Sequence, residues 1–383
     1  MSHKVMHICL SEGWGGLEMY PARIIPELER QGWQAHGLAL AGSRVAASLE
    51  EAGIVPLTVS SRGGALLAAP RILRYLKHHD IRVVHCHKSS DLRLAALLAS
   101  LRPSLRLVFT EHMGVTRPKK GLYHRWAYGK LSRLLSISEA TRARNLKAFA
   151  LPPERIRRLY LGIDTAPYRP RLMEQERDSL RAELGIPEGA LAIGLPGRLT
   201  PGKGQELWLE ALAELARLAP QLTFQGVLIG GLEASEGSDE AYVARLRSRI
   251  AELALGERVT LTGFRRDLPR LMEALDVVCV PSVNEAFGLT VIEAMAAGKA
   301  VVGADSGAIP ELLPPECGRL APPDSPLAWA EALVELAEDV GLRRALGQAA
   351  AERVRREFEI SGHITALTDI YDEVLDEGAS ASR

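Results

Sequence analysis

The chain has 383 residues, too many for one ordinary hydrophobic core, and this length predicts two domains of roughly 150–200 residues each. Its 47% hydrophobic and 25% charged residues are typical of a globular protein, and no apolar run approaches the roughly 20 residues that span a bilayer. The net charge is zero, but residues 1–168 carry 25 Lys and Arg against 12 Asp and Glu. This asymmetry favours a membrane or nucleic-acid surface as a partner of the basic half; attraction between oppositely charged halves is the alternative.

The cysteines and the first residues indicate the compartment. The four cysteines are isolated and show neither metal-ligand spacing nor a disulfide framework: Cys9, Cys86, Cys279 and Cys317. The first ten residues are typical of a buried strand rather than of a signal peptide, whose apolar region would be longer. The sequence therefore predicts a cytoplasmic, reducing environment.

Strand-like and helical runs alternate along the whole chain, which predicts parallel sheets flanked by helices, the α/β class. In the first half, strands are expected near residues 4–10, 35–40, 55–59, 81–86, 105–110 and 134–138. Turn residues at 161–170 predict an interdomain linker. A helix near 171–185 is followed by expected strands near 191–196, 224–229, 258–262, 276–280 and 300–303. A last apolar-faced helix is expected at 361–377, and residues 378–383 are expected to form a frayed tail.

A glycine-rich turn with Gly13, Gly15 and Gly16 lies between the first expected strand and the first expected helix. Backbone N–H groups of such turns bind anions, and a plain tight turn is the alternative. The turn lacks the full G-x-G-x-x-G pattern, and no acidic residue ends the second strand. An NAD-dependent enzyme is therefore disfavoured.

Histidines close two neighbouring strands of the first half. His85 and His87 end the run near 81–86, and His112 follows the run near 105–110, at strand ends where chemistry gathers in such sheets. A histidine that caps its strand through hydrogen bonds is the structural alternative for His112. A histidine pair two residues apart occurs in zinc sites, but no third ligand follows at metal spacing, so no metal site is predicted.

The loop after the strand at 191–196 combines glycines with Arg198 and Lys203. Glycines let the backbone approach a ligand closely, and the two cations suit a diphosphate. The loop is not a Walker loop, because its spacing differs and no Lys-Ser/Thr pair ends it. A surface turn is the alternative.

The most informative stretch runs from residue 276 to residue 302. A β-branched run is followed by a loop with Glu285, a helical run with Glu293 and a second apolar run. In parallel α/β units a ligand lies where the loop meets the helix, so N–H groups near Gly288 suit phosphate, and carboxylates suit vicinal hydroxyls. A sugar nucleotide carries both groups. The alternatives are a helix-dipole role for Glu285 and a plain surface role for Glu293.

This stretch resembles the E-x7-E signature of the retaining GT-B glycosyltransferases of family 4, and the loop of Arg198 and Lys203 resembles the family's G-R-L-x3-K-G element. The resemblance covers residues 5–375 and is closer in the second half. It implies two Rossmann-like parallel-sheet domains facing a cleft: an acceptor-binding domain at 1–165 and a donor-binding domain at 171–360. It also implies that the last helix, 361–377, crosses back to the first domain.

The resemblance also implies residue roles. Arg198 and Lys203 hold the donor diphosphate, Glu293 binds the ribose hydroxyls and Glu285 binds the sugar hydroxyls. On the acceptor side, the turn of Gly15 and Gly16 faces both substrates, and His112 and His87 lie beside the sugar and acceptor. The remaining donor-binding residues implied are Gly230, Phe264, Arg265, Ala286, Phe287, Gly288 and Leu289. Leu161 stands where the family's linker motif usually has Asn.

The implied activity is transfer of a hexose-type sugar from a UDP-, GDP- or ADP-sugar to a hydroxyl of a glycan or glycolipid, with retention, in lipopolysaccharide or cell-surface polysaccharide synthesis. No D-x-D motif is present, so no metal or other cofactor is expected; no nucleic-acid partner is expected either. A GT-B sugar-nucleotide epimerase, or a non-catalytic nucleotide-sugar-binding protein, is the alternative.

Residues 117–135 mix cations with apolar and aromatic residues. Leu122, Trp126, Leu131 and Leu134 are expected to share one helix face, which predicts docking on an anionic membrane at the inner face of the cytoplasmic membrane. The alternative is a helix that buries this face in the first domain, which Gly129 favours because it weakens an isolated helix.

Overall fold

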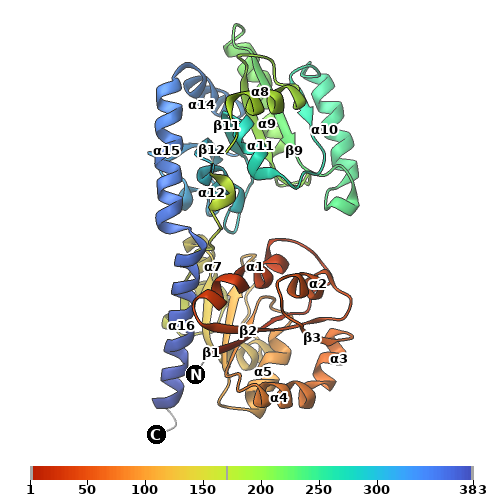
Figure 1. The fold of residues 1–383 in the computed structure, drawn as a ribbon, viewed down its shortest axis with the longest axis vertical. Coiled ribbons are helices and arrows are strands. Elements are labelled where there is room, and N and C mark those ends of the chain that lie inside the picture. The colour runs from red at the N-terminus through yellow and green to blue at the C-terminus, as the bar shows by residue number, and fades with distance from the viewer. Residues whose placement is uncertain (1–2, 170, 381–383) are drawn as a thin grey trace. The chain divides into compact units, whose positions relative to one another are not determined.

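A computed structural model describes residues 3–169 and 171–380, which form two compact units (Figure 1). Unit 1 combines residues 3–162 with residues 360–380, and unit 2 contains residues 163–169 and 171–359. The domains predicted from the sequence were 1–165, with the last helix, and 171–360. The chain passes from unit 1 to unit 2 after Gly162, within the predicted linker 161–170, whose last residue lies outside the described residues.

Unit 1 is built on a parallel sheet in the order β3-β2-β1-β4-β5-β6-β7. Its strands are β1 (His3–Cys9), β2 (Trp33–Leu40), β3 (Leu57–Val59), β4 (Val83–Cys86), β5 (Arg106–Glu111), β6 (Leu131–Ser136) and β7 (Ile156–Arg158). Its helices are α1 (Gly16–Arg30), α2 (Arg44–Glu51), α3 (Arg62–Leu67), α4 (Ala69–His78), α5 (Leu92–Leu101), α6 (Leu122–Gly129), α7 (Glu139–Ala148) and α16 (Ile360–Ser380).

The two faces of this sheet are buried differently. One face packs aliphatic side chains such as Met6, Ile8 and Leu107 into a core shared with α4 and α5. Because successive strand residues point to opposite faces, His7, His85 and Thr110 belong to the other face, where they are also buried. Polar side chains buried in this way must find hydrogen-bond partners.

Helix α16 supplies some of these hydrogen-bond partners. Helix α16 packs against α1 and β5 of unit 1 (Figure 1). The hydroxyl of its buried Tyr371 lies 2.6 Å from Nδ1 of His85. Arg133 of β6 binds Glu377 of α16 through both terminal guanidinium nitrogens. The predicted return of the last helix to the first domain is therefore confirmed. Residues 378–380 belong to this helix rather than to a frayed tail, and residues 381–383 lie outside the described residues.

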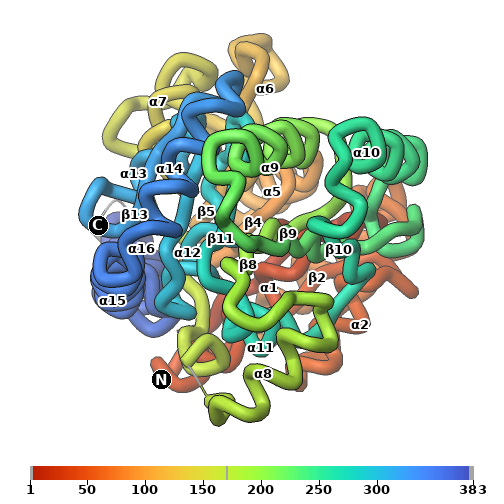
Figure 2. The backbone as a smooth tube through the Cα atoms, turned by 90° about the horizontal axis from the view of Figure 1, so that it is seen from above, coloured from red at the N-terminus to blue at the C-terminus, as the bar shows by residue number. Residues whose placement is uncertain are grey.

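Unit 2 is built on a second parallel sheet, in the order β10-β9-β8-β11-β12-β13. Its strands are β8 (Leu191–Pro196), β9 (Phe224–Ile229), β10 (Val259–Leu261), β11 (Val277–Val280), β12 (Ala300–Ala304) and β13 (Gly318–Ala321). Its helices are α8 (Glu174–Glu183), α9 (Gln205–Leu218), α10 (Glu240–Glu252), α11 (Leu268–Ala274), α12 (Leu289–Ala296), α13 (Ile309–Leu312), α14 (Pro326–Glu338) and α15 (Val340–Glu357). The tube in Figure 2 shows α9 and α10 next to each other.

The predicted class, two Rossmann-like parallel sheets flanked by helices, is confirmed. Every predicted strand is present, with ends shifted by a few residues, and the short strands β7 and β13 were not predicted. One expectation is wrong: α6 ends at Gly129, and Leu131 and Leu134 lie in β6 rather than on a helix face with Leu122. Both leucines are buried in the sheet between β5 and β7, a tertiary setting that overrides the local helical spacing.

Candidate functional site

In each sheet the strand order reverses beside the first strand of the unit. In unit 2, β8 lies between β9 and β11, and in unit 1, β1 lies between β2 and β4. Ligands of open α/β sheets bind at the carboxyl ends of the strands at such reversals. The loops at these ends carry Arg198, Lys203 and Glu285 in unit 2, and Gly15, Gly16 and His87 in unit 1.

The loops that follow β8 and β11 are held against each other. The N–H of Val283 donates to the carbonyl oxygen of Gly202 at 3.1 Å. Gly204 has a φ of +76°, and a Cβ there would lie 2.3 Å from the carbonyl oxygen of Pro281, so glycine permits this approach. As a result Lys203 forms an ion pair with Glu285, 82 positions along the chain. Both side chains remain partly exposed, at 31% and 21%.

Arg198 lies in the first of these two loops, and Gly230, directly after β9, lies beside that loop. Arg198 is exposed, and its carbonyl oxygen accepts a hydrogen bond of 2.9 Å from Nε2 of the buried Gln205. A Cβ at Gly230 would lie 2.1 Å from the carbonyl oxygen of Gly197. Gly230 therefore permits the end of β9 to pack against the loop of Arg198.

The backbone of Glu285 is supported from the loop after β12. The N–H of Ala308 donates to the carbonyl oxygen of Glu285 at 3.0 Å, and the N–H of Asn284 donates to Oγ of Ser306, also at 3.0 Å. Gly307 has a φ of +63°, and a Cβ there would lie 2.5 Å from the carbonyl oxygen of Glu285. The loop after β12 thus fixes the backbone that carries this carboxylate.

Glu293 lies half-buried in α12, which begins directly after Gly288. Gly288 has a φ of +112°, and no side chain caps the helix. Of the neighbouring predicted residues, Phe287 is buried with its ring 6.1 Å from that of Phe358, whereas Ala286 and Leu289 are partly exposed.

The segment after β10 contains two further predicted residues, which behave differently. Phe264 is 52% exposed, although it is aromatic. Arg265 binds both carboxylate oxygens of Asp267 at 2.8 Å and also binds Glu183 at 2.8 Å. The hydrogen bonds with Asp267 and Glu183 raise the pKa of Arg265, and this side chain is already committed to carboxylates within unit 2.

In unit 1, α1 begins at Gly16 with Gly15 as an extended N-cap that no side chain closes. A small polar cluster lies beside this turn. Oγ of Ser11 donates to Glu18 and accepts from Nζ of Lys88, at 2.8 Å each, and Lys88 lies 3.5 Å from Glu18. Lys88 offsets the charge of the Glu18 carboxylate, which lies in the first turn of α1. A bound anion is favoured at this end of a helix.

His87 and His112 lie together, as the sequence led us to expect, and a third histidine joins them. Nδ1 of His87 lies 3.3 Å from Nε2 of His112, and Nε2 of His87 lies 3.0 Å from Nδ1 of His7. The ring of Tyr20, on α1, packs on His112 and His87 with centroid distances of 5.0 and 5.2 Å. Sequence reasoning missed His7; its signal was a polar residue inside the otherwise apolar run of the first strand.

His7 and His87, together with the neighbouring His85, form the only cluster within the described residues that has the composition of a metal site. Ligand atoms of His7, His85 and His87 lie within 4.8 Å of one another. However, both nitrogens of His85 bond to Tyr371 and Thr110, at 2.6 and 2.7 Å, and both nitrogens of His87 face other imidazoles. A metal ion would have to displace these hydrogen bonds, so the donor set fits a hydrogen-bonded network better than a metal site.

A pocket of about 380 Å³ opens next to these histidines in unit 1. Cations contribute to its lining through Lys88, Arg117 and Lys119, and the buried Glu111 contributes a carboxyl whose pKa is raised by burial. The complete lining is Leu17, His87, Lys88, Ser89, Phe109, Glu111, Met113, Gly114, Val115, Thr116, Arg117 and Lys119. The pocket suits a ligand that carries both hydroxyl groups and an anionic group.

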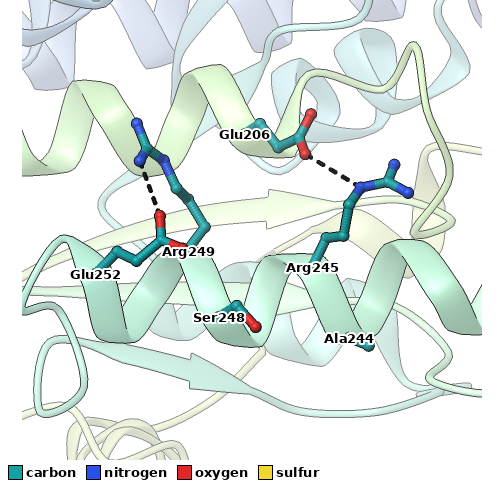
Figure 3. Close-up of a pocket in the computed structure, with 6 residues that line it drawn as sticks. All are labelled: Glu206, Ala244, Arg245, Ser248, Arg249 and Glu252. Carbon is teal, nitrogen blue, oxygen red and sulfur yellow. Dashed lines mark hydrogen bonds and ion pairs between the residues drawn. The ribbon is translucent and has the colours of Figure 1, made fainter.

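A second pocket, of about 370 Å³, lies between α9 and α10 of unit 2 (Figure 3). Its cations are already paired: Arg249 binds Glu252 at 3.0 Å and Glu210 at 2.8 Å, and Arg245 lies 3.7 Å from Glu206. Because these cations are already paired with carboxylates, they do not call for a bound anion.

Helix α6 exposes apolar side chains, which goes against the alternative to membrane docking, a helix that buries this face in the first domain. Leu122, Tyr123 and Trp126 are 87%, 43% and 39% exposed, whereas Ala127 and Tyr128 are buried. Exposed Lys120 and Arg125 lie on the same short segment. Within residues 3–169 and 171–380 no helix combines the length and hydrophobicity needed to cross a bilayer.

Comparison with known families accounts for both halves of the chain. Residues 14–167 match the family described as Glycosyltransferase Family 4, and residues 176–353 match the family described as Glycosyl transferases group 1. The chain belongs to glycosyltransferase family 4. This family 4 chain is 34% identical over 224 residues to a D-inositol 3-phosphate glycosyltransferase from Corynebacterium efficiens, a match that covers 58% of the chain and 51% of that protein. The chain thus spans about half the length of the first such curated relatives.

Other similar proteins align over more of the family 4 chain. A lipopolysaccharide core biosynthesis mannosyltransferase from Rhizobium leguminosarum bv. viciae is 28% identical over 301 residues, covering 78% of this chain and 80% of that protein. A glycosyltransferase from Rickettsia africae has a TM-score of 0.88 at 19% identity, covering 98% and 99% of the two chains. Anabaena Alr3699/HepE, in complex with UDP and glucose, has a TM-score of 0.78 at 24% identity, covering 97% and 99%. At these identities the solved structures establish the fold.

Proposed function

We propose that the chain transfers a hexose-type sugar, with retained configuration, from a nucleoside diphosphate sugar to a hydroxyl of a glycan or glycolipid acceptor. The observation that carries this proposal is the ion pair of Lys203 and Glu285 at the strand ends of unit 2. It joins a cation suited to a diphosphate to a carboxylate suited to sugar hydroxyls. The complex of the Anabaena protein with UDP and glucose, and the relative named as a lipopolysaccharide core mannosyltransferase, support the substrate class and a role in lipopolysaccharide synthesis.

The chemistry proposed for unit 2 is electrostatic. When the sugar leaves, negative charge grows on the diphosphate, and Arg198, Lys203 and the uncapped start of α12 stabilise it. Lys203 exchanges its partner Glu285 for phosphate when the donor binds, which releases Glu285 to the sugar hydroxyls. Glu293 binds the ribose, and Phe264 stacks on the base. Since fixed cations neutralise the leaving group, a chelator should leave turnover unchanged.

Unit 1 is proposed to bind the acceptor in the pocket next to His87. Its lining of Lys88, Arg117 and Lys119 favours an acceptor with a phosphate or another anionic group. The relative that acts on D-inositol 3-phosphate supports an anionic acceptor. For retention, the departing phosphate takes the acceptor proton on the face that it leaves, and His112 holds or polarises a substrate oxygen.

Donor hydrolysis without acceptor tests the proposal directly. Wild-type protein incubated with UDP-, GDP- and ADP-sugars should release free sugar slowly from one of them. Glu285→Gln should reduce this release while keeping nucleoside diphosphate affinity, because the sugar contact matters most as the bond breaks. Glu293→Gln should chiefly weaken nucleoside diphosphate affinity, measured by calorimetry. Absence of release from every donor, together with unchanged affinity in Glu293→Gln, would refute the assignment.

We also propose that the exposed apolar residues of α6 dock on an anionic membrane, which would place the chain peripherally at the inner face of the cytoplasmic membrane. Leu122, Tyr123 and Trp126 supply apolar area, and nearby cations each contribute about 1 kcal/mol near anionic lipid. Co-sedimentation with anionic vesicles should fall when Lys120, Arg125 and Lys130 are all changed to Ser. The matched control changes Arg71, Arg74 and Lys77 of α4 to Ser and should still bind. Equal recovery with neutral and anionic vesicles would argue against docking.

A further inference from the structure

Three buried imidazoles form a continuous line at the strand ends of unit 1. His7 lies on β1, His87 follows β4 and His112 follows β5. Nδ1 of His7 is 3.0 Å from Nε2 of His87, and Nδ1 of His87 is 3.3 Å from Nε2 of His112. The same pair of atoms, Nδ1 of one ring and Nε2 of the next, therefore makes both links.

Each of these rings is neutral in the folded protein. All three are at most 9% exposed, and burial lowers the pKa of His7 and of His112 to about 3 and that of His87 well below its usual value. A neutral imidazole carries one N–H and one bare nitrogen. Each link needs an N–H on one side and a bare nitrogen on the other, so all three rings must adopt the same tautomer.

The buried end of the line selects that tautomer. Nε2 of His7 is buried and has no hydrogen-bond partner among the residues that the structure describes. If the rings carried their protons on Nε2, this end would be a buried N–H without an acceptor. If they carry them on Nδ1, the end is a bare nitrogen. Orphaned buried N–H groups are rarer than buried acceptors left unsatisfied, which favours protons on Nδ1 throughout.

We propose that this line fixes His112 in the Nδ1–H tautomer and so makes Nδ1 a hydrogen-bond donor to a substrate oxygen. His87 and His7 are positioning residues, because they act through His112. The inference that Nδ1 of His112 donates to a substrate rests on the proposed function, whereas the inference about its tautomer does not. A neutral ring with its proton on Nδ1 and its Nε2 engaged by His87 can hold or polarise an oxygen there but cannot accept a proton through that atom.

His85 supplies a matched comparison because it is buried beside the line without belonging to it. Its ring centroid lies 4.3 Å from that of His87, but its nitrogens bond to Tyr371 and Thr110 instead. Tyr371→Phe removes one of these hydrogen bonds with little change of shape. It should perturb the hydrogen bonding of this buried region without changing the tautomer of His112.

The test is nitrogen NMR of the full chain labelled with ¹⁵N-histidine, which distinguishes an N–H nitrogen from a bare one. The His112 signals are assigned by their loss in His112→Gln. In the wild type, without ligands, His112 should show a proton on Nδ1 and a bare Nε2, as should His87 and His7. A proton on Nε2 of His112, an even mixture of tautomers, or stoichiometric zinc in the purified protein would overturn the proposal.

A variant then tests the coupling. His87→Leu removes the donor to Nε2 of His112, so the single tautomer should give way to a mixture, while Tyr371→Phe keeps the single tautomer. In an assay with a sugar nucleotide and an acceptor, His87→Leu should lower kcat and leave the KM for the sugar nucleotide unchanged. A single His112 tautomer in a folded His87→Leu variant would also refute the coupling. If the tautomers are as proposed but no sugar is transferred, the proposed function fails and the imidazole line stands.

Discussion

Lys203 and Glu285 form an ion pair with each other, although each is suited to a different part of a sugar nucleotide. Their side chains are partly exposed, so the ion pair adds little to folding, about 0–1 kcal/mol. Its importance is positional, because two loops joined by a backbone hydrogen bond hold the groups together before a ligand arrives.

Changing Lys203 to Ala should lower turnover by about two to three orders of magnitude, the effect of removing one preorganised charge-stabilising group. The thermal unfolding of unit 2 should hardly change, since the lysine lies partly exposed on a loop. Arg247→Ala on α10 removes an exposed cation from the same unit, away from the loops of Lys203 and Glu285, and serves as the control. Initial rates at saturating donor decide the matter, and near-full turnover in Lys203→Ala would exclude a role at the diphosphate.

The candidate donor site of unit 2 was largely predictable from the sequence because its residues follow strands and lie in short motifs. Arg198, Lys203 and Glu285 were found by glycine and charge spacing, and sheet order explains why these loops meet. His7 was not predicted, because its partner His87 lies 80 residues away and only strand pairing brings them together. Helix α6 was misjudged for a similar reason: sequence spacing cannot show that Leu131 enters the sheet.

At the level of elements, the loop after β12 acts as a support for the loop of Glu285. Gly307→Ala should therefore displace Glu285, although Glu285 itself is unchanged. The left-handed backbone costs an alanine about 1–2 kcal/mol, and its Cβ would overlap the backbone of Glu285. A displaced Glu285 should lower turnover on the order of 100-fold.

Gly256→Ala is the matched control, because a Cβ at Gly256 meets no atom within 4 Å. Chemical unfolding followed by the buried Trp208 and Trp329 reports the stability of unit 2, and donor hydrolysis reports the site. Equal turnover in the two variants would show that the loop after β12 does not position Glu285.

Across the whole molecule, the histidines are distributed very unevenly. All 10 lie in residues 1–162 and 360–383, and residues 163–359 contain none. Burial lowers the pKa of His7 and His112 to about 3 and that of His363 to about 4, and it holds those of His85 and His87 well below their usual value. The unfolded chain therefore binds protons below about pH 6.5 that the folded unit 1 does not bind.

Unit 1 should accordingly lose stability as the pH falls from about 6.5 toward about 4, by about 1.4 kcal/mol per pH unit for each such histidine. Burial raises the pKa of Asp91, to about 6, and that of Glu111, which opposes this loss in part. Hydrogen exchange at about pH 7 and about pH 5, corrected for intrinsic rates, should show protection lost first in unit 1. Earlier opening of unit 2 would contradict the prediction.

The return of α16 to unit 1 also sets the order in which the chain can be completed during its synthesis. Unit 2 is one continuous segment, whereas unit 1 lacks Tyr371 and Glu377 until residues 360–380 have followed unit 2 out of the ribosome. At about 5–20 residues per second, the face of the sheet that carries His85 waits roughly 10–40 s for its covering helix. Unit 1 is therefore completed after unit 2, and a nascent-chain chaperone has its longest opportunity at the strands that carry His7 and His85.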